Sequence, residues 1–223
     1  MTSYPVKILL TEPVTHNVKR FKIEKPAGYT YIPGQATEIS IDTPDWKNER
    51  RPFTFTSLTA WDHLEFTIKI YTDHAGVTNQ LGQVKAGDTL LLHDVFGAIQ
   101  YHGEGTFIAG GAGVTPFIAI LRQLQQENKL AQNKLLFSNN TEKDIILKEE
   151  FSRMLGKNFV NTLTQEKSSA YDNGKIDKAY LSNKIDNFSQ YFYLCGPDPM
   201  VEALQRDLLA LGADPKKVIV EQF

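Results

Sequence analysis

The chain has 223 residues and a formal net charge of −2, with 41% hydrophobic and 22% charged residues, close to the composition of ordinary globular proteins. This length accommodates two domains of about 100–120 residues each. A dedicated nucleic-acid binder needs a basic surface to neutralise phosphates, so the balanced charge argues against that class.

Cysteine, histidine and the N-terminal residues exclude further classes. Cys195 is the single cysteine, too few for an intrachain disulfide or for the four thiolates that usually hold an iron–sulfur cluster. The five histidines lack zinc-ligand spacing, so no metal site is expected. The N-terminal residues lack a signal-peptide pattern and no apolar run reaches the ~20 residues of a membrane span, so we expect a cytoplasmic protein.

Up to about residue 102, apolar residues recur at every second position. Val6, Ile8 and Leu10 alternate with polar or less apolar neighbours, and the run 64–71, LEFTIKIY, is the clearest case. This period predicts strands with one buried face. Turn signals such as Pro33-Gly34 separate the runs. Several short strands at this spacing predict an antiparallel barrel or sandwich.

From Gly105 onward, short apolar strands alternate with amphipathic helices. The first strand, TFIAGG, leads into a helix that Thr115 can cap and whose first turn suits Pro116. The last strand, KVIVEQF, is expected to run to the chain end. This alternation predicts a doubly wound parallel sheet covered on both faces. We therefore expect two domains, residues 1–102 and 103–223.

Two glycine turns follow apolar strands in the second half. The first, residues 110–116, GGAGVTP, would bring backbone N–H groups and a helix N-terminus to a diphosphate. Its spacing is G-x-G-x-x-P rather than G-x-G-x-x-G, so a plain strand–helix turn remains the alternative. The second, residues 195–200, CGPDPM, could converge on the same crevice. The expected nucleotide-binding residues are Gly110, Gly111, Gly113, Thr115 and Pro116, with Cys195, Gly196, Pro197 and Met200.

The first half contains three segments that resemble the flavin motifs of the ferredoxin reductase superfamily, in the right order. Arg51-Pro52-Phe53-Thr54 resembles R-x-Y-S/T, with Phe53 in the tyrosine position. Lys69-Ile70-Tyr71 and Gly76-Val77-Thr78 resemble the next two segments, and the two glycine turns resemble the family's nicotinamide segments. The resemblance covers nearly the whole chain. It implies a flavin-binding antiparallel β-barrel followed by an NAD(P)-binding α/β domain.

The resemblance assigns roles that suit each residue type. Arg51 would pair with flavin phosphate, Phe53 would stack on the ring, and Thr54 would hydrogen-bond near its reactive nitrogen. Lys69 and Tyr71 would share one strand face beside the ring, with backbone groups of Ile70 at its edge. Backbone and hydroxyl groups of Gly76, Val77 and Thr78 would contact phosphate. Alternatively, Arg51 is a solvated charge, Phe53 a core residue, and Lys69 and Tyr71 the wet face of an edge strand.

Three residues near the chain end are candidates for the reacting centre. The resemblance places the Cys195 thiol beside the reacting nicotinamide carbon, where it would limit the positions of the ring. It also places Phe223 against the flavin and Glu221 near the nicotinamide. The alternatives are an inert buried cysteine and a terminal strand residue that packs or frays.

The coenzyme preference depends on the segment after the strand at LLFSNN. The run LLFSNNTEKDIILKEEF resembles the NADH-dependent cytochrome b5 reductases. Ser138, Asn139 and Asn140 include no arginine for a 2′-phosphate and no acid for a ribose hydroxyl, although Lys143 could compensate. NADH is therefore favoured over NADPH.

The expected activity is hydride transfer from a nicotinamide to FAD, with FMN as the other possible flavin. Electrons would then pass to a separate acceptor, such as flavodoxin, ferredoxin or a small molecule. The alternatives are a free-flavin or quinone reductase of the same fold, and a non-catalytic nucleotide-sensing module.

Overall fold

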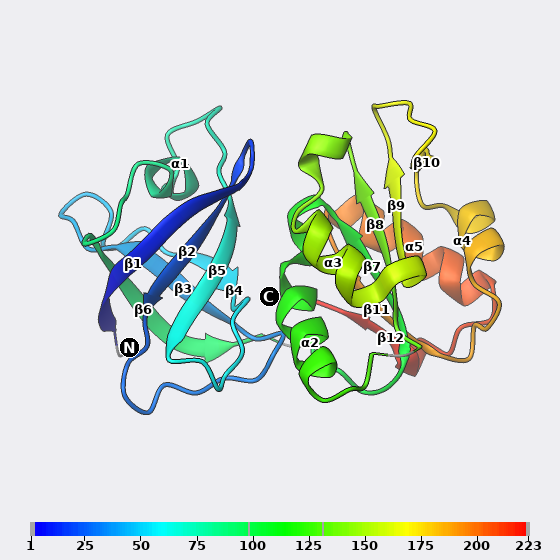
Figure 1. Ribbon diagram of the computed structural model, residues 1–223, viewed down its shortest axis with the longest axis horizontal. Helices are drawn as coiled ribbons and strands as arrows, with labels where there is room; N and C mark the ends of the chain where they lie inside the picture. Colours follow the sequence, from blue (N-terminus) through cyan, green and yellow to red (C-terminus); the bar gives the residue numbers. More distant parts are fainter. Residues whose placement is uncertain (1–2, 98, 131, 222–223) are drawn as a thin grey trace. The chain divides into compact units, whose positions relative to one another are not determined.

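The computed structural model describes residues 3–97, 99–130 and 132–221. The chain forms two compact units, each described by itself below (Figure 1). The first comprises Met1–Gln100 and Thr115–Gln123, and the second Tyr101–Val114 and Leu124–Phe223. The chain therefore leaves the first unit, returns to it for nine residues of one helix, and leaves again.

The first unit is built on a six-stranded antiparallel sheet with the order β4-β3-β6-β1-β2-β5. An antiparallel bridge between Phe55 and Phe66 and a 2.8 Å hydrogen bond from Thr56 N to Glu65 O join the two ends of this order. The sheet therefore closes into the expected barrel. Its elements are β1 (Tyr4–Thr15), β2 (Val18–Glu24), β3 (Ala36–Ile41), β4 (Arg51–Thr54), β5 (His63–Lys69), β6 (Thr89–Phe96) and the short helix α1 (Val77–Leu81).

Alternating side chains fill the barrel, and burial of each large apolar side chain contributes about 1.5–3 kcal/mol. Phe21, Phe55 and Phe66 are fully buried there. Two expectations from the alternation are wrong. A register shift after Ile8 turns Leu10 outward, leaving it 40% exposed. Strand β5 is buried on both faces, because its polar residues 65 and 67 are covered as well.

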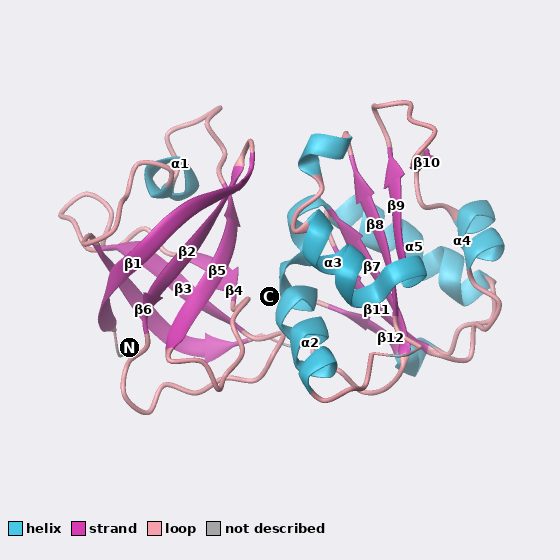
Figure 2. Ribbon diagram, in the orientation of Figure 1, coloured by secondary structure: helices cyan, strands magenta, loops and turns pink. Residues whose placement is uncertain are grey.

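The second unit contains a parallel sheet with the order β10-β9-β8-β7-β11-β12. Helix α3 lies on one face and helices α4 and α5 on the other, as expected for a doubly wound sheet (Figure 2). The strands are β7 (Gly105–Gly110), β8 (Lys134–Asn139), β9 (Phe159–Leu163), β10 (Asp172–Asn173), β11 (Tyr191–Cys195) and β12 (Val218–Val220). The helices are α3 (Lys148–Leu155), α4 (Lys178–Lys184) and α5 (Asp198–Ala210), with 3-10 turns η1 (Gly111–Val114), η2 (Glu142–Asp144), η3 (Gly156–Asn158) and η4 (Pro215–Lys217).

Helix α2 (Thr115–Gln126) joins the two units along the chain. It begins at Thr115 directly after η1, so Thr115 is its first residue rather than the expected cap. Burial extends around most of the helix: Phe117, Ile118, Ala119, Ile120 and Leu121 are all 2% exposed or less. The helix is therefore buried over more of its surface than the amphipathic pattern expected from the sequence.

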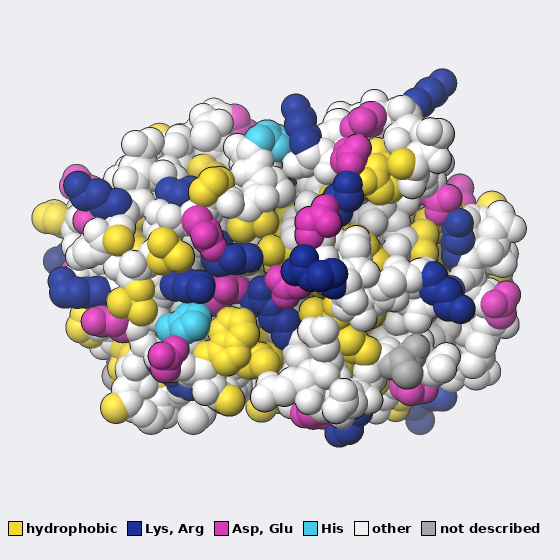
Figure 3. Space-filling model, in the orientation of Figure 1, with side chains coloured by type: hydrophobic (Ala, Val, Ile, Leu, Met, Phe, Trp, Pro, Cys, Tyr) yellow, Lys and Arg dark blue, Asp and Glu magenta, His cyan; other side chains and the backbone are white. Residues whose placement is uncertain are grey.

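The remaining findings concern the chain end, membrane-spanning helices and surface charge. Strand β12 ends at Val220, so the last strand does not extend over Glu221 as expected, and Gln222 and Phe223 lie outside the described residues. In the part of the chain that the structure describes, no helix is long and apolar enough to cross a membrane. Charged side chains of both signs are scattered over the face shown in Figure 3.

Candidate active site

The two glycine turns meet at the switch point of the parallel sheet. Strands β7 and β11 are neighbours, although β8 and β9 follow β7 in the chain. A Cβ on Gly113 would overlap the backbone carbonyl of Cys195, and one on Gly196 would lie 3.1 Å from Gly110 N. A Cβ on Gly110 would lie 2.6 Å from Met200 Sδ. The turns thus pack backbone against backbone at the strand ends where α/β sheets bind ligands.

Cys195 and Glu221 are brought together by the register of the last two strands. Leu194 pairs with Val220, so the next residues of β11 and of the chain after β12 are neighbours. The Cys195 thiol donates a 3.0 Å hydrogen bond to Glu221 Oε2. Cys195 is 6% exposed. The pair is therefore largely removed from water at the carboxyl end of β11.

This environment determines the protonation of the pair. Burial raises the pKa of the Cys195 thiol, and the nearby Glu221 carboxylate raises it further by its charge and by accepting the thiol hydrogen bond. Burial also raises the pKa of the Glu221 carboxyl, partly offset by the hydrogen bond from Cys195. The thiol is therefore protonated at pH 7 and does not supply the thiolate that a nucleophilic attack requires. It can instead act as a small polarizable contact surface.

The loops after β8 and β9 are tied together by hydrogen bonds, one between backbone groups and one from a backbone N–H to a carboxylate. Asn139 O accepts from Thr164 N at 2.9 Å, and the Glu166 carboxylate accepts from Glu142 N at 2.8 Å. The segment 138–140 itself contains no acid, but the Glu166 carboxylate contacts the nearby Glu142. Glu166 is distant in sequence from that segment, and only the pairing of β9 with β8 brings it there.

The three residues of that segment differ in their surroundings. Asn140 is exposed and its Oδ1 accepts a 3.1 Å hydrogen bond from Thr164 Oγ1, whereas Ser138 is half-buried. Asn139 is 4% exposed, and its side-chain amide has no hydrogen-bond partner among the described residues. The side-chain amide of Asn139 is therefore buried rather than presented at the surface. Lys143 is exposed in η2.

The first two flavin segments adjoin along β4 and β5. The Arg51 side chain is 51% exposed and lies 3.7 Å from Glu49, Phe53 packs half-buried against the barrel core, and Thr54 is buried. Strand β5 ends at Lys69, so Tyr71 lies beyond the strand rather than on its face. Tyr71 is nevertheless in contact with Lys69, whose Nζ lies 5.5 Å from the ring centroid.

The third flavin segment begins helix α1. Gly76 is its N-cap residue and has no side chain to cap the helix. Val77 is buried in the barrel core. A Cβ on Gly76 would lie 2.9 Å from the ring of His74, an exposed side chain that can move aside. The barrel surface thus offers an exposed aromatic ring at Tyr71, a half-buried one at Phe53, and two cations, Arg51 and Lys69. This donor set fits a flat, anionic flavin nucleotide.

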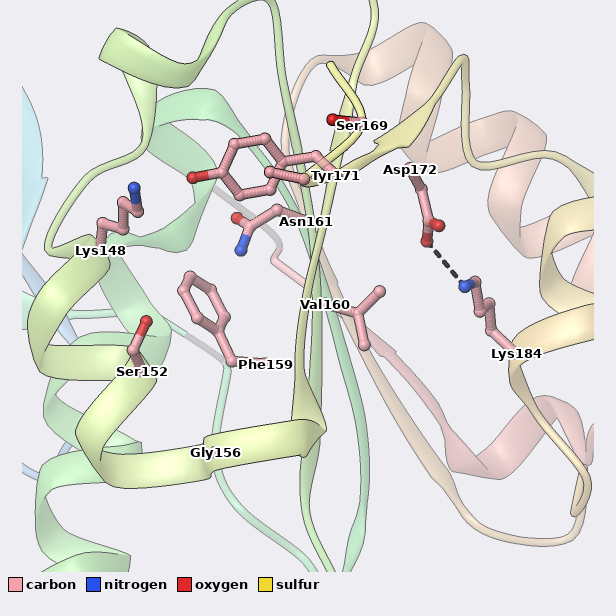
Figure 4. A pocket seen from close by; sticks show the side chains of 11 residues that line it. Lys148, Ser152, Gly156, Phe159, Val160, Asn161, Ser169, Tyr171, Asp172 and Lys184 are labelled. Atoms are coloured by element: carbon pink, nitrogen blue, oxygen red, sulfur yellow. Dashed lines mark ion pairs between the residues drawn. The ribbon is translucent and has the colours of Figure 1, made fainter.

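A cavity of about 370 Å³ lies at the β9–β10 edge of the second unit (Figure 4). Its charged walls are already paired: Asp172 lies 2.8 Å from Lys184, and Lys148 lies 2.6 Å from Glu142. The Tyr171 hydroxyl also donates to Glu142, at 2.8 Å. None of its lining residues belongs to the glycine turns or to the flavin segments, so we assign it no role in the reaction.

Comparison with known proteins identifies the domains. A family model described as an oxidoreductase FAD-binding domain matches residues 5–101, and one described as an oxidoreductase NAD-binding domain matches residues 107–206. The chain is 26% identical over 238 residues to the reductase component of propane 2-monooxygenase from Rhodococcus jostii (strain RHA1), covering 97% of this chain and 62% of that protein. It is 28% identical over 254 residues to NADH-cytochrome b5 reductase 1 of Homo sapiens, covering 96% and 83%.

Solved structures share the fold. The FAD/NAD-binding domain of nitric oxide dioxygenase from Vibrio cholerae has a TM-score of 0.87 at 22% identity, covering 98% of each chain. A ferredoxin NADP+ reductase from Neisseria gonorrhoeae with bound FAD and NADP has a TM-score of 0.82 at 22% identity, covering 95% of this chain and 92% of that one. The chain thus combines an oxidoreductase FAD-binding domain with an oxidoreductase NAD-binding domain, and it is similar over most of its length to flavin- and nicotinamide-dependent reductases.

Proposed function

We propose that this chain transfers a hydride from NADH to FAD and passes the electrons on to a separate protein acceptor of the flavodoxin or ferredoxin type. The observation that carries the proposal is the buried Cys195–Glu221 pair, which lies beside the glycine turns at the switch point. A neutral thiol at this position restricts a nicotinamide ring without reacting with it. Restricting the ring favours a geometry close to that of hydride transfer.

The remaining residues bind and orient. Gly110 and Gly113 allow the two glycine turns to pack closely, and Gly111 leaves open space beside the backbone, where a diphosphate could approach. Arg51 is available for flavin phosphate, and Phe53 and Tyr71 for the flavin ring. Glu221 accepts the hydrogen bond of the Cys195 thiol and so orients it. When bound, FAD supplies the two-electron acceptance and the one-electron release that these side chains cannot perform.

Glu166 supports the preference for NADH. Its carboxylate is held at the joined ends of β8 and β9, where it would repel a 2′-phosphate and could accept a hydrogen bond from a ribose hydroxyl. The human relative is named as an NADH-dependent enzyme. Both observations favour the unphosphorylated coenzyme.

The relatives support a protein acceptor but do not identify the one that this chain uses. The Rhodococcus relative is named as the reductase component of a monooxygenase, which implies a separate partner for that protein. The chain spans 62% of that relative, so the remaining 38% of that protein has no counterpart in this chain. We therefore assign the acceptor by chemistry, as a one-electron carrier protein.

An anaerobic titration tests the proposal. Purified protein is titrated with NADH and then NADPH while flavin absorbance is followed, and oxidised flavodoxin, ferredoxin or free FMN is then added. Bleaching of tightly bound flavin by NADH and its reoxidation by a carrier protein are expected. A colourless protein that turns over added flavin would identify a free-flavin reductase instead. Nucleotide binding without bleaching would identify a sensing module.

A further inference from the structure

A buried carboxylate lies on the outer face of the barrel, where neither flavin nor nucleotide binding explains it. Glu65 on β5 is 2% exposed. Its Oε1 accepts hydrogen bonds from Arg122 Nη1 at 2.6 Å and from Thr56 Oγ1 at 2.9 Å, and Arg20 Nε lies 3.6 Å from its Oε2. An isolated buried carboxylate is costly, so these partners are what allow it to stay ionised.

The main partner comes from helix α2. The Arg122 side chain is 10% exposed and also donates to Thr56 O at 2.7 Å, and its guanidinium lies 5.3 Å from the centroid of the Trp61 ring. All these residues belong to the first unit. The planar Arg122 guanidinium thus holds α2 against the barrel through its ion pair with Glu65, its directional hydrogen bonds and its stacking on Trp61.

Thr56 and Arg122 both lie close in sequence to segments that we assign to cofactor binding. Thr56 is two residues after Thr54, the last residue of β4 and of the segment that we assign to the flavin. Arg122 is seven residues, about two helical turns, after Thr115, where α2 begins beyond the glycine turn. A helix behaves as a stiff rod over two turns, so a fixed Arg122 also fixes the N–H groups of the first turn.

We propose that Arg122 is a positioning residue, which holds α2 through Glu65 and Thr56 so that the diphosphate end of the helix is preorganised for the pyridine nucleotide. The proposal rests on the proposed function, because it assumes that the nucleotide binds at this turn. A contact that only stabilised the barrel would not affect nucleotide affinity once the protein is folded and loaded with flavin.

The test compares matched variants of the whole flavin-loaded protein. Arg122→Met alone leaves Glu65 short of its main partner and risks unfolding, so the double variant Glu65→Gln/Arg122→Met removes both charges while keeping the volume. Arg122→Lys keeps the charge but loses the planar fork. Arg20→Met is the control, because it removes the other cation near Glu65 from β2 without involving α2.

Binding of ADP-ribose is measured by calorimetry, together with the KM and kcat for NADH and the melting temperature. We expect the double variant to bind ADP-ribose about tenfold more weakly and to raise KM by a similar factor, with kcat within about twofold. Arg122→Lys should fall between this variant and the parent, and Arg20→Met should keep the parent's affinity.

Equal ADP-ribose affinity in the parent and the double variant would overturn the positioning role, and so would an equal loss in Arg20→Met. The calorimetric arm does not depend on turnover. A protein that binds ADP-ribose but does not reduce flavin would therefore reject the proposed function, while the affinities of the variants would still decide the role of Arg122.

Discussion

At the scale of single residues, Cys195 shows how burial determines chemistry. Burial raises the pKa of its thiol, and the hydrogen-bonded Glu221 carboxylate raises it further. The strand YFYLC and the turn after it can be read from the sequence, but the partner cannot. Glu221 lies 26 residues away, and only the pairing of β11 with β12 brings it to the thiol. Position and protonation together support a steric rather than a nucleophilic role.

The substitution Cys195→Ser tests that role. Serine places a shorter, more polar group in the same space, so the nicotinamide ring would be held less closely. A misplacement of about 1 Å can reduce the rate roughly a hundredfold. We expect stopped-flow reduction of bound flavin by NADH to slow by one to two orders of magnitude, with flavin content unchanged because Arg51 and its neighbours are untouched. A parental reduction rate in folded, flavin-loaded protein would leave Cys195 as core packing.

At the scale of elements, strand β5 shows what a sequence pattern reveals and what it omits. The alternation of residues 64–71 correctly predicted a strand with an apolar face in the core. It could not show that the opposite face is covered, because Arg122 is 57 residues away from Glu65. An alternating polar residue is equally consistent with water and with a buried guanidinium. Tertiary contacts of this kind decide the difference.

The Glu65–Arg122 pair makes stability depend on pH. Burial tends to raise the pKa of the Glu65 carboxyl, but the charge and hydrogen bond of Arg122, aided by Arg20 and Thr56, outweigh it and hold the pKa below 4.5. A lowered folded pKa contributes stability above the unfolded value of 4.5, and this contribution is lost as pH falls through the folded value. Glu65→Gln removes the titrating group. Urea unfolding should therefore show a parent-minus-variant difference that is constant near pH 7 and shrinks below pH 4.5, whereas a difference independent of pH down to 3 would contradict the pairing.

The joined loops after β8 and β9 make a second prediction at this scale. In the parent, the Glu166 carboxylate, in the loop after β9, accepts a hydrogen bond from Glu142 N. Glu166→Lys replaces this carboxylate with a cation. A cation attracts a 2′-phosphate, so the ratio of kcat/KM for NADH to that for NADPH should fall about tenfold, equivalent to about 1.4 kcal/mol. Lys143→Glu is a matched change in the neighbouring η2 turn and should raise the ratio if Lys143 takes part. An unchanged ratio in Glu166→Lys would place the ribose elsewhere.

At the scale of the whole molecule, the sequence predicted a barrel followed by an α/β domain, and both are present. The change from a two-residue apolar period to alternating strands and helices was sufficient for this prediction, because both patterns are local. Sequence could not show the return of residues 115–123 to the first unit. That return depends on contacts such as Ile120 packing beside Gly34, which join residues 86 positions apart. The division between residues 102 and 103 stays a prediction, and it leaves this segment out of the barrel domain.

A fragment of residues 1–102 therefore lacks part of its own core. Without α2, Glu65 loses Arg122, and Gly34 and Thr56 lose their covering side chains. A loss of about 2–3 kcal/mol lowers the melting temperature of a domain of this size by at least about 10 °C. We expect circular dichroism to show this loss relative to the full chain, with weaker retention of FAD. Glu65→Gln should then act with opposite signs: in the full chain it destabilises, because it leaves the buried Arg122 unpaired, whereas in the fragment it is neutral or stabilising. A fragment that melts and retains FAD like the full chain would show that α2 contributes nothing to the barrel.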